Sequence, residues 1–107
     1  MFVYLLHFAR PISPHHTCRH YIGYTNDLAA RLQCHQLGNG ARLVQVANAR
    51  GIPFQLVRVW RGGRGLERQL KNRKEAPALC PICNPGNRKA AANELTSEEI
   101  ATALLPF

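Results

Sequence analysis

The sequence predicts a small α/β (α+β) domain, because it combines three apolar segments typical of β-strands with several segments of helical periodicity. A chain of 107 residues fits one compact domain with one modest core. Its 46% hydrophobic content favours a packed core, and its 19% charged content argues against disorder. No stretch approaches the ~20 apolar residues of a membrane span, and the apolar start is too short for a signal peptide. We therefore expect a cytoplasmic protein without membrane association.

The first segments predict a β-hairpin. Residues 2–8 are rich in strand-forming side chains and are followed by residues 11–17, where two prolines and two histidines predict a loop. Residues 19–23 predict the second strand. Tyr4 and Tyr21 fall on the two arms of this hairpin, where their side chains can project to one face.

A helix is expected directly after the hairpin. Thr25 or Asn26 can cap its N-terminus, and Asp27 then lies in the first turn, where a negative charge is favoured. Leu28 and Leu32 are four residues apart and supply its buried face.

The middle of the chain predicts a break, a second helix and a third strand. Gly38-Asn39-Gly40 ends the first helix, and residues 41–49 can form the second. Residues 54–60 alternate well enough for a strand. We expect this strand to be central in the sheet because it is the most β-branched of the three.

The last third predicts a basic helix and a short terminal helix. The basic helix contains Leu66 and Leu70 and reaches about Lys74, whereas residues 77–86 predict an irregular, proline-rich segment. Near the end, the sequence at 95–100 predicts a capping box. In it, Thr96 caps the helix, Glu99 reaches back and Leu95 can pack against Ile100.

The charge balance favours a polyanionic partner such as DNA. Lys and Arg number 14 and Asp and Glu number 6, so the net charge is +8. Arg is far commoner than Lys, which suits bidentate contacts with phosphate. A solvated basic surface without a partner is the alternative.

Carboxylates are scarce, and this limits the chemistry. Up to residue 93 the chain has only Asp27, Glu67 and Glu75. A glycosidase-like acid pair, or a nuclease with several acids around two metals, would have to draw on these three. The scarcity indicates one metal held by very few protein ligands.

Glu67 is the most informative carboxylate, because the segment from Arg58 to Lys74 holds seven basic residues and this one acid. It can form an ion pair with Lys71 four residues on, worth only ~0.3–0.5 kcal/mol on an exposed face. Alternatively it offers an oxygen ligand to Mg²⁺ or Mn²⁺, since Mg²⁺ keeps several waters and takes one or two carboxylates plus phosphate oxygens. Arg68 and Lys71 beside it would contact nucleic acid.

Arg31 and His35 are four residues apart and therefore lie on one helix face. Arg31 can neutralise charge on a phosphate, and His35 can hold a phosphate or move a proton. A solvated polar face is the alternative, and spacing alone favours it.

Tyr4 or Tyr21 can position or deprotonate a water, although two core aromatics fit the same pattern. Tyr24 is a further candidate for this role, and because it follows the turn glycine we expect it to be exposed.

The segment Cys80-Pro81-Ile82-Cys83 has the two-residue spacing of half a zinc site. Without a secretory signal, disulfides are not expected. A Zn²⁺ site would need further ligands from Cys18, Cys34 or histidines such as His15, His16 and His20. We favour a turn with reduced thiols over a zinc site.

Five short motifs occur in a specific order. They are Val3-Tyr4, Tyr21-Ile22-Gly23, Thr25-Asn26-Asp27-Leu28 followed by Arg31 and His35, Gly38-Asn39-Gly40-Ala41, and Glu67-Arg68-Gln69-Leu70-Lys71. Together they resemble the GIY-YIG nuclease superfamily, in particular its small single-domain members. The resemblance covers roughly residues 2–75.

This resemblance implies a central three-stranded antiparallel sheet flanked by helices and hydrolysis of DNA phosphodiester bonds with one divalent ion, Mg²⁺ or Mn²⁺. By position, Glu67 would be the metal ligand and Arg31 would stabilise the scissile phosphate. Tyr4 and Tyr21 would line the site, one of them helping to activate water. His35 would assist with phosphate or proton handling. No small-molecule cofactor is expected.

We therefore assign residues 1–83 to a GIY-YIG-like nuclease domain and residues 84–107 to a C-terminal extension with a short helix. Two other functions stay open at this point. One is a non-catalytic nucleic-acid-binding module with the same fold. The other is a protein-interaction adaptor that uses the cysteine-containing turn and the terminal helix.

Overall fold

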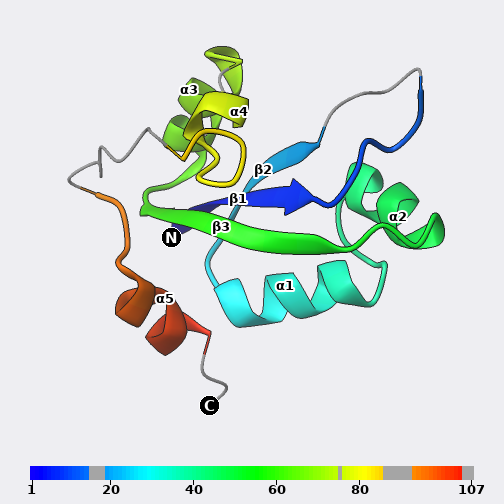
Figure 1. Cartoon of the computed structure of the whole chain (residues 1–107). Helices are drawn as coiled ribbons and strands as arrows, with labels where there is room; N and C mark the ends of the chain where they lie inside the picture. Colours follow the sequence, from blue (N-terminus) through cyan, green and yellow to red (C-terminus); the bar gives the residue numbers. More distant parts are fainter. Residues whose placement is uncertain (15–18, 75, 86–92, 105–107) are drawn as a thin grey trace.

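The computed structural model describes residues 1–14, 19–74, 76–85 and 93–104. Within these ranges three strands and five helices follow one another along the chain (Figure 1). They are β1 (Phe2–Phe8), β2 (His20–Thr25), α1 (Leu28–Gln36), α2 (Arg42–Ala49), β3 (Phe54–Arg61), α3 (Arg64–Asn72), α4 (Ala76–Leu79) and α5 (Ser97–Ala103).

The strands form an antiparallel sheet with the order β2-β1-β3, which confirms the predicted α+β class. The prediction that the strand at 54–60 is central is wrong, because β1 occupies that place. Six of the seven β1 residues are buried, whereas Gln55 and Arg61 of β3 are exposed. A central strand is covered on both faces, so continuous burial identifies it better than β-branching does.

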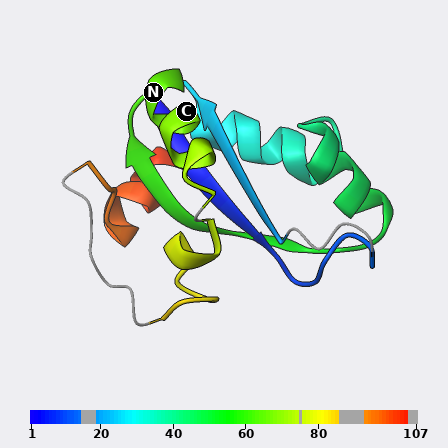
Figure 2. The same cartoon turned by 90° about the horizontal axis from the view of Figure 1, so that it is seen from above.

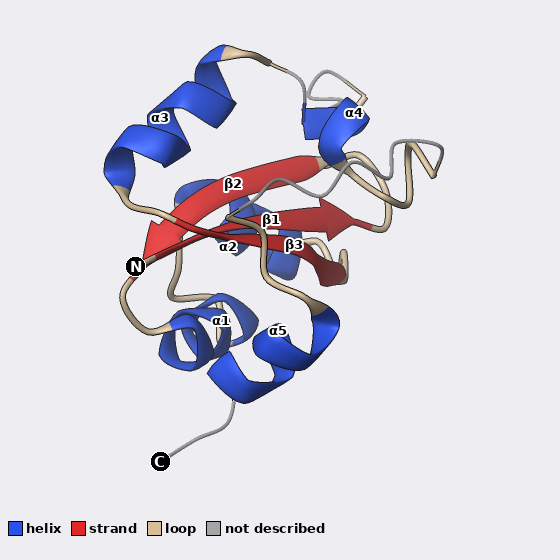
Figure 3. Cartoon of the chain, turned by 90° about the vertical axis from the view of Figure 1, so that its left-hand side faces the viewer, coloured by secondary structure: helices blue, strands red, loops and turns tan. Residues whose placement is uncertain are grey.

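Helices cover both faces of the sheet (Figure 3). Tyr4, Leu6 and Phe8 of β1 point into a first core, to which α1, α2 and α5 contribute apolar residues. Val3 and Leu5 point the other way, into a second core with residues from α3 and α4. In Figure 2, α4 (yellow) and α1 (cyan) accordingly lie on opposite sides of β1 and β2.

The N-terminus of α1 differs from the prediction by one residue. Asp27, not Thr25 or Asn26, is the N-cap, and its side chain accepts a hydrogen bond from the Ala30 N–H at 3.1 Å. Thr25 instead accepts from the Asp27 N–H at 3.1 Å and so fixes the approach to the helix. Gly38 with φ +78° follows α1, as expected for a glycine that ends a helix.

Residues 77–86 were expected to be irregular, but a short helix, α4, begins at Ala76. The amide of Cys80 donates to the Ala76 carbonyl at 3.0 Å, and the amide of Asn84 donates to the Cys80 carbonyl at 2.8 Å. Cys80 is fully buried in the second core. The buried Cys80 side chain therefore anchors this segment, which forms regular turns although it contains prolines.

The segment after residue 93 packs on the same sheet. Arg58 of β3 makes a two-bond ion pair with Glu94, at 2.7 and 2.6 Å, and Leu95 is buried in the first core. The predicted capping box at Thr96 and Glu99 is present in full. Among the residues described, no helix is long and apolar enough to cross a membrane.

Candidate functional sites

A cavity of about 490 Å³ opens where β2, α1 and α3 meet. We call it the basic cavity, and it is lined by Tyr21, Tyr24, Arg31, Arg64, Glu67, Arg68, Lys71 and Asn72. Four of these side chains are cationic and one, Glu67, is a carboxylate. The sequence had assigned Tyr21, Arg31, Glu67, Arg68 and Lys71 to one site, and all five line this cavity.

Glu67 lies in the first turn of α3 with only 17% of its side chain exposed. The Lys71 Nζ approaches one of its carboxylate oxygens at 3.7 Å. The ion pair considered from the sequence is therefore formed. Because the same carboxylate lines the cavity, pairing with Lys71 does not remove it from the site.

Tyr4 and Tyr21 point to the same face of the hairpin, as the sequence predicts, with ring centroids 6.1 Å apart. Gly23, which pairs with Tyr4 in the sheet, leaves room for both rings. A Cβ atom at this position would lie 2.5 Å from the Tyr4 hydroxyl oxygen and 2.8 Å from the Tyr21 ring. Only glycine fits here without displacing an aromatic ring.

The two tyrosines differ in exposure. Tyr21 lines the cavity, whereas Tyr4 is fully buried beneath it. Arg31 donates from Nε to the Tyr4 hydroxyl oxygen at 3.4 Å, and that hydroxyl lies 2.7 Å from Nε2 of His35. Burial raises the pKa of Tyr4 to about 12, although the Arg31 hydrogen bond acts in the opposite direction. Tyr4 is therefore a neutral hydroxyl that connects His35 to Arg31.

His35 is a core residue, which corrects the expectation of a solvated polar face on α1. Its side chain has no exposed surface and stacks edge-on against Tyr4 and Tyr21. Its Nδ1 lies directly against the Cα of Gly40, in space that any larger residue there would fill. Burial and the nearby Arg31 lower the pKa of His35 to about 4. His35 is thus neutral near pH 7 and reaches the basic cavity only through Tyr4.

Two further cavity residues were not singled out from the sequence. Arg64 lies three residues before Glu67 on α3, with its guanidinium 5.3 Å from the centre of the Tyr24 ring. Asn72 lies one residue after Lys71 at the end of the helix. Arg64 could have been predicted from the sequence, because it lies three residues before Glu67 and residues three apart share a helix face.

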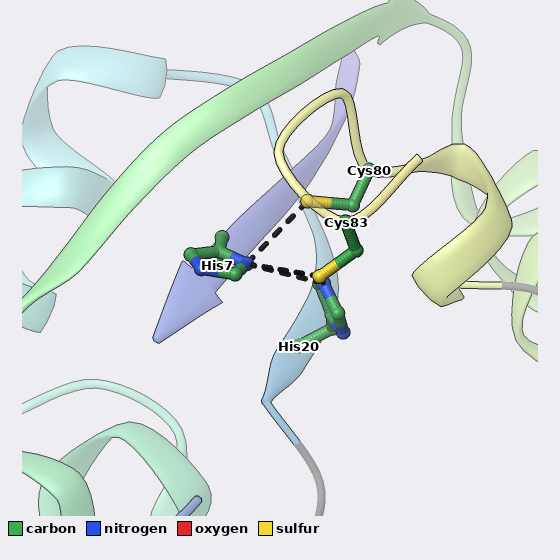
Figure 4. A group of neighbouring side chains, drawn as sticks. All are labelled: His7, His20, Cys80 and Cys83. Atoms are coloured by element: carbon green, nitrogen blue, oxygen red, sulfur yellow. Dashed lines mark hydrogen bonds between the residues drawn. The ribbon is translucent and has the colours of Figure 1, made fainter. Parts of the chain in front are cut away.

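A second group of side chains with metal-binding capacity lies apart from the basic cavity (Figure 4). It consists of His7, His20, Cys80 and Cys83, and we call it the His/Cys cluster. One nitrogen or sulfur atom from each residue lies within 4.8 Å of every other, so the group could hold a metal ion. The first three residues are buried and Cys83 is exposed. The sequence favoured a turn with reduced thiols and no metal site. In the structure, both thiols lie beside two imidazoles with which they could share a metal ion.

Of the partners suggested from the sequence for the Cys80 and Cys83 pair, only His20 belongs to this cluster. Cys34 is exposed on α1 and is not part of it, and His15, His16 and Cys18 lie outside the described residues. His7 was missed. It stands directly opposite His20 in the register of β1 and β2, so the hairpin pairing was the signal that could have revealed it.

Comparisons of this chain with known protein families, with curated proteins and with solved structures give no match. The resemblance to the GIY-YIG nucleases therefore rests on the ordered motifs in residues 2–75 alone.

Proposed function

We propose that this chain is a metal-dependent endonuclease that hydrolyses DNA phosphodiester bonds, as its resemblance to the GIY-YIG nucleases implies. One observation supports this most directly. Glu67 and Arg31 come from different helices, yet both line one cavity together with Tyr21. A carboxylate, a guanidinium and a phenol around a basic cavity can together hold a metal ion, stabilise charge on a phosphate and position a water for metal-assisted cleavage of a phosphodiester.

The cations of the basic cavity would bind the DNA backbone. Arg64, Arg68 and Lys71 lie along α3, and Arg31 faces them from α1. Guanidinium groups bind phosphate oxygens with two parallel hydrogen bonds, so this arrangement suits a phosphate held between the two helices. Contacts of this kind position the backbone without reading its sequence. We therefore infer a low sequence specificity.

The residues of the basic cavity fit one divalent ion, Mg²⁺ or Mn²⁺. Glu67 would hold it, because the cavity lining described here includes no other carboxylate. Four cationic neighbours oppose binding of a free cation but attract phosphate, and phosphate oxygens are the remaining ligands that Mg²⁺ prefers. We infer that the ion enters together with the DNA. When bound, it would stabilise negative charge on the scissile phosphate.

Tyr21 is the better candidate for positioning the attacking water, because its ring borders the cavity whereas Tyr4 is fully buried. The Lys71 Nζ lies 5.6 Å from the centre of the Tyr21 ring and adds positive charge beside it. Tyr4 and His35 would act as positioning residues. Their hydrogen bonds fix the Arg31 side chain from below.

In the proposed reaction, water attacks the phosphorus and one P–O bond of the backbone breaks. Negative charge builds on the non-bridging oxygens as the new bond forms. Arg31 stabilises this charge, since its guanidinium is held before the reaction by Tyr4 and does not have to reorganise. Tyr21, one of the two tyrosines that line the cavity, would accept a hydrogen bond from the attacking water and so position it. The proton that this water loses would pass to solvent, and the departing oxygen would take up a proton from solvent.

A non-catalytic nucleic-acid-binding module is the second candidate. The pairing of Glu67 with Lys71 at 3.7 Å favours it, because an engaged carboxylate is a weaker metal ligand. Such a module would bind DNA with a strong dependence on salt but would leave it intact.

Incubation with supercoiled plasmid and Mg²⁺ or Mn²⁺ separates the two. We expect nicking by the wild type and a fall of about 10²–10³-fold in Glu67→Ala and Arg31→Ala. Glu98→Ala and Arg42→Ala are matched controls, because both residues are exposed and lie outside the basic cavity. Equal nicking by all five proteins would assign the cleavage to a contaminant or to another site. Salt-sensitive DNA binding without nicking would establish the binding module instead.

A further inference from the structure

We propose that His7, His20, Cys80 and Cys83 bind one structural Zn²⁺ ion. This site is separate from the proposed DNA-cleaving cavity and does not depend on its activity. It would join the end of β1, the start of β2 and the turn after α4 (Figure 4).

Four of the six distances between the ligand atoms match a tetrahedral zinc site, and the other two are within 4.8 Å. With Zn–N of about 2.0–2.1 Å and Zn–S of about 2.3 Å, tetrahedral angles separate two nitrogens by about 3.3 Å and a nitrogen from a sulfur by about 3.6 Å. In the His/Cys cluster, His7 Nδ1 and His20 Nε2 are 3.3 Å apart. The nitrogen-to-sulfur distances are 3.4 Å from His7 to Cys80, 3.7 Å from His7 to Cys83 and 3.5 Å from His20 to Cys83.

Hydrogen bonding alone does not account for this arrangement. His7 Nδ1 is approached by three polar atoms, which belong to His20, Cys80 and Cys83. A neutral ring nitrogen carries either one proton or one lone pair, so it satisfies only one of these partners well. A cation at the centre of the four atoms satisfies all of them, because each then directs a lone pair at the metal.

The charges of the site also suit Zn²⁺. Two thiolates and two neutral imidazoles balance the charge of the ion, which a mostly buried site needs. Soft sulfur ligands with imidazole favour Zn²⁺ over Mg²⁺ or Ca²⁺, which prefer oxygen.

Four protein ligands complete a tetrahedral shell and leave no position for substrate, so the ion would be structural. Its effect follows from where the ligands lie in the chain. His7 and Cys83 are 76 residues apart, and the ion would hold the turn after α4 against the hairpin. That turn covers the second core, into which Cys80 and Leu70 of α3 are packed. Zinc would therefore stabilise the side of the sheet that carries α3.

The test is the metal content of the purified full-length chain, prepared under reducing conditions and dialysed against metal-free buffer. We expect one zinc per chain in the wild type and in Cys34→Ser, the control at an exposed thiol outside the cluster. Cys83→Ser should lose most of its zinc, while Cys83→His, which restores a nitrogen ligand, should retain it. Cobalt substitution of the wild type should give the visible absorption of a tetrahedral ion with thiolate ligands.

Two results would overturn the proposal. One is a wild type that holds no zinc after refolding with Zn²⁺ and reductant. The other is a full complement of zinc in both Cys80→Ser and Cys83→Ser. If these variants aggregate, the zinc content and cobalt spectrum of the wild type still decide, because neither measurement depends on a mutant. Plasmid nicking does not enter the test, so failure of the nuclease proposal would leave this result unaffected.

Discussion

The basic cavity and the His/Cys cluster both include residues of β2, but they differ in exposure and in the kinds of side chain that surround them. Tyr21 and Tyr24 of this strand line an open cavity with four cations and one carboxylate. His20, at the start of the same strand, lies in a compact group of nitrogen and sulfur atoms, and three of its four residues are buried. The basic cavity therefore offers one carboxylate to a metal ion, whereas the His/Cys cluster offers four possible ligand atoms.

This difference indicates how each location would use an ion. In the basic cavity, an ion held by Glu67 needs phosphate oxygens to complete its shell, so its binding depends on substrate. In the His/Cys cluster, the protein would supply every ligand, so an ion bound there would need no partner and would stabilise the fold. A small chain with few acids can therefore combine an exchangeable ion with a permanent one. Four predictions test this contrast, from the largest expected effect to the smallest.

Replacing Arg31 should separate the two locations most clearly. Arg31→Ala removes the guanidinium that Tyr4 orients, so DNA nicking should fall about 10²–10³-fold, equivalent to about 3–4 kcal/mol. Zinc content should stay at the wild-type level, because Arg31 is not part of the His/Cys cluster. Nicking rates and metal analysis on one preparation measure both. Loss of zinc together with activity would show that the two locations are not independent.

Acid should destabilise the protein through His35. Its pKa is about 4 in the folded chain against an ordinary 6.5, so unfolded chains bind a proton that folded chains exclude. This contribution is complete above pH 6.5 and is lost as the pH falls towards 4, to a total of about 3 kcal/mol. Denaturant unfolding of the wild type and His35→Phe at several pH values measures it.

The variant should have the shallower pH dependence of the two. His7 and His20 are unchanged in the variant, so any pH dependence that they contribute is the same in both proteins and cancels in the difference. Identical slopes for the two proteins would mean that the buried imidazole of His35 is not the group that takes up the proton.

Enlarging Gly23 should damage the basic cavity and spare the His/Cys cluster. The added methyl of Gly23→Ala would lie 2.5 Å from the Tyr4 hydroxyl oxygen, so one of the two tyrosine rings must move. Overpacking of this kind costs about 1–3 kcal/mol of unfolding free energy. Thermal unfolding together with zinc content measures it, and Gly65→Ala is the control because no atom lies near its Cβ position. Equal melting temperatures for the two variants would contradict the packing described for Tyr4.

The smallest effect is expected at the ion pair within the cavity. Lys71 is half-exposed, so its pairing with Glu67 is worth at most about 0.5 kcal/mol of stability. Lys71→Met should leave the melting temperature nearly unchanged while reducing the salt dependence of DNA binding by about one phosphate contact. Binding titrations at several salt concentrations measure this slope. An unchanged slope would remove Lys71 from the DNA interface.

Features set by neighbours in the sequence were predictable. The capping box at Thr96 depends on residues three apart, and the glycine stop after α1 depends on one backbone conformation. The common face of Tyr4 and Tyr21 followed from the alternation of two strands. Local rules of this kind also gave the class of the fold.

Features set by distant contacts were not predictable in the same way. The strand order depends on which strand is covered on both faces, and the burial of His35 depends on Tyr4 and on the loop at Gly40. The His/Cys cluster depends on the pairing of His7 with His20 across a long loop whose length does not fix the register. Spacing alone revealed Cys80 and Cys83, His20 was one of several possible further ligands, and His7 was missed.

The most direct test of the proposed mechanism is the uptake of Mn²⁺ by the protein–DNA complex, followed by the loss of the free-ion signal in electron paramagnetic resonance. A DNA analogue that resists cleavage keeps the complex intact, and DNA alone gives the background. We predict one additional Mn²⁺ per chain in the wild-type complex, little uptake by the protein without DNA, and no additional uptake with Glu67→Gln. Equal uptake by the wild-type and Glu67→Gln complexes would contradict the assignment of Glu67 as the metal ligand.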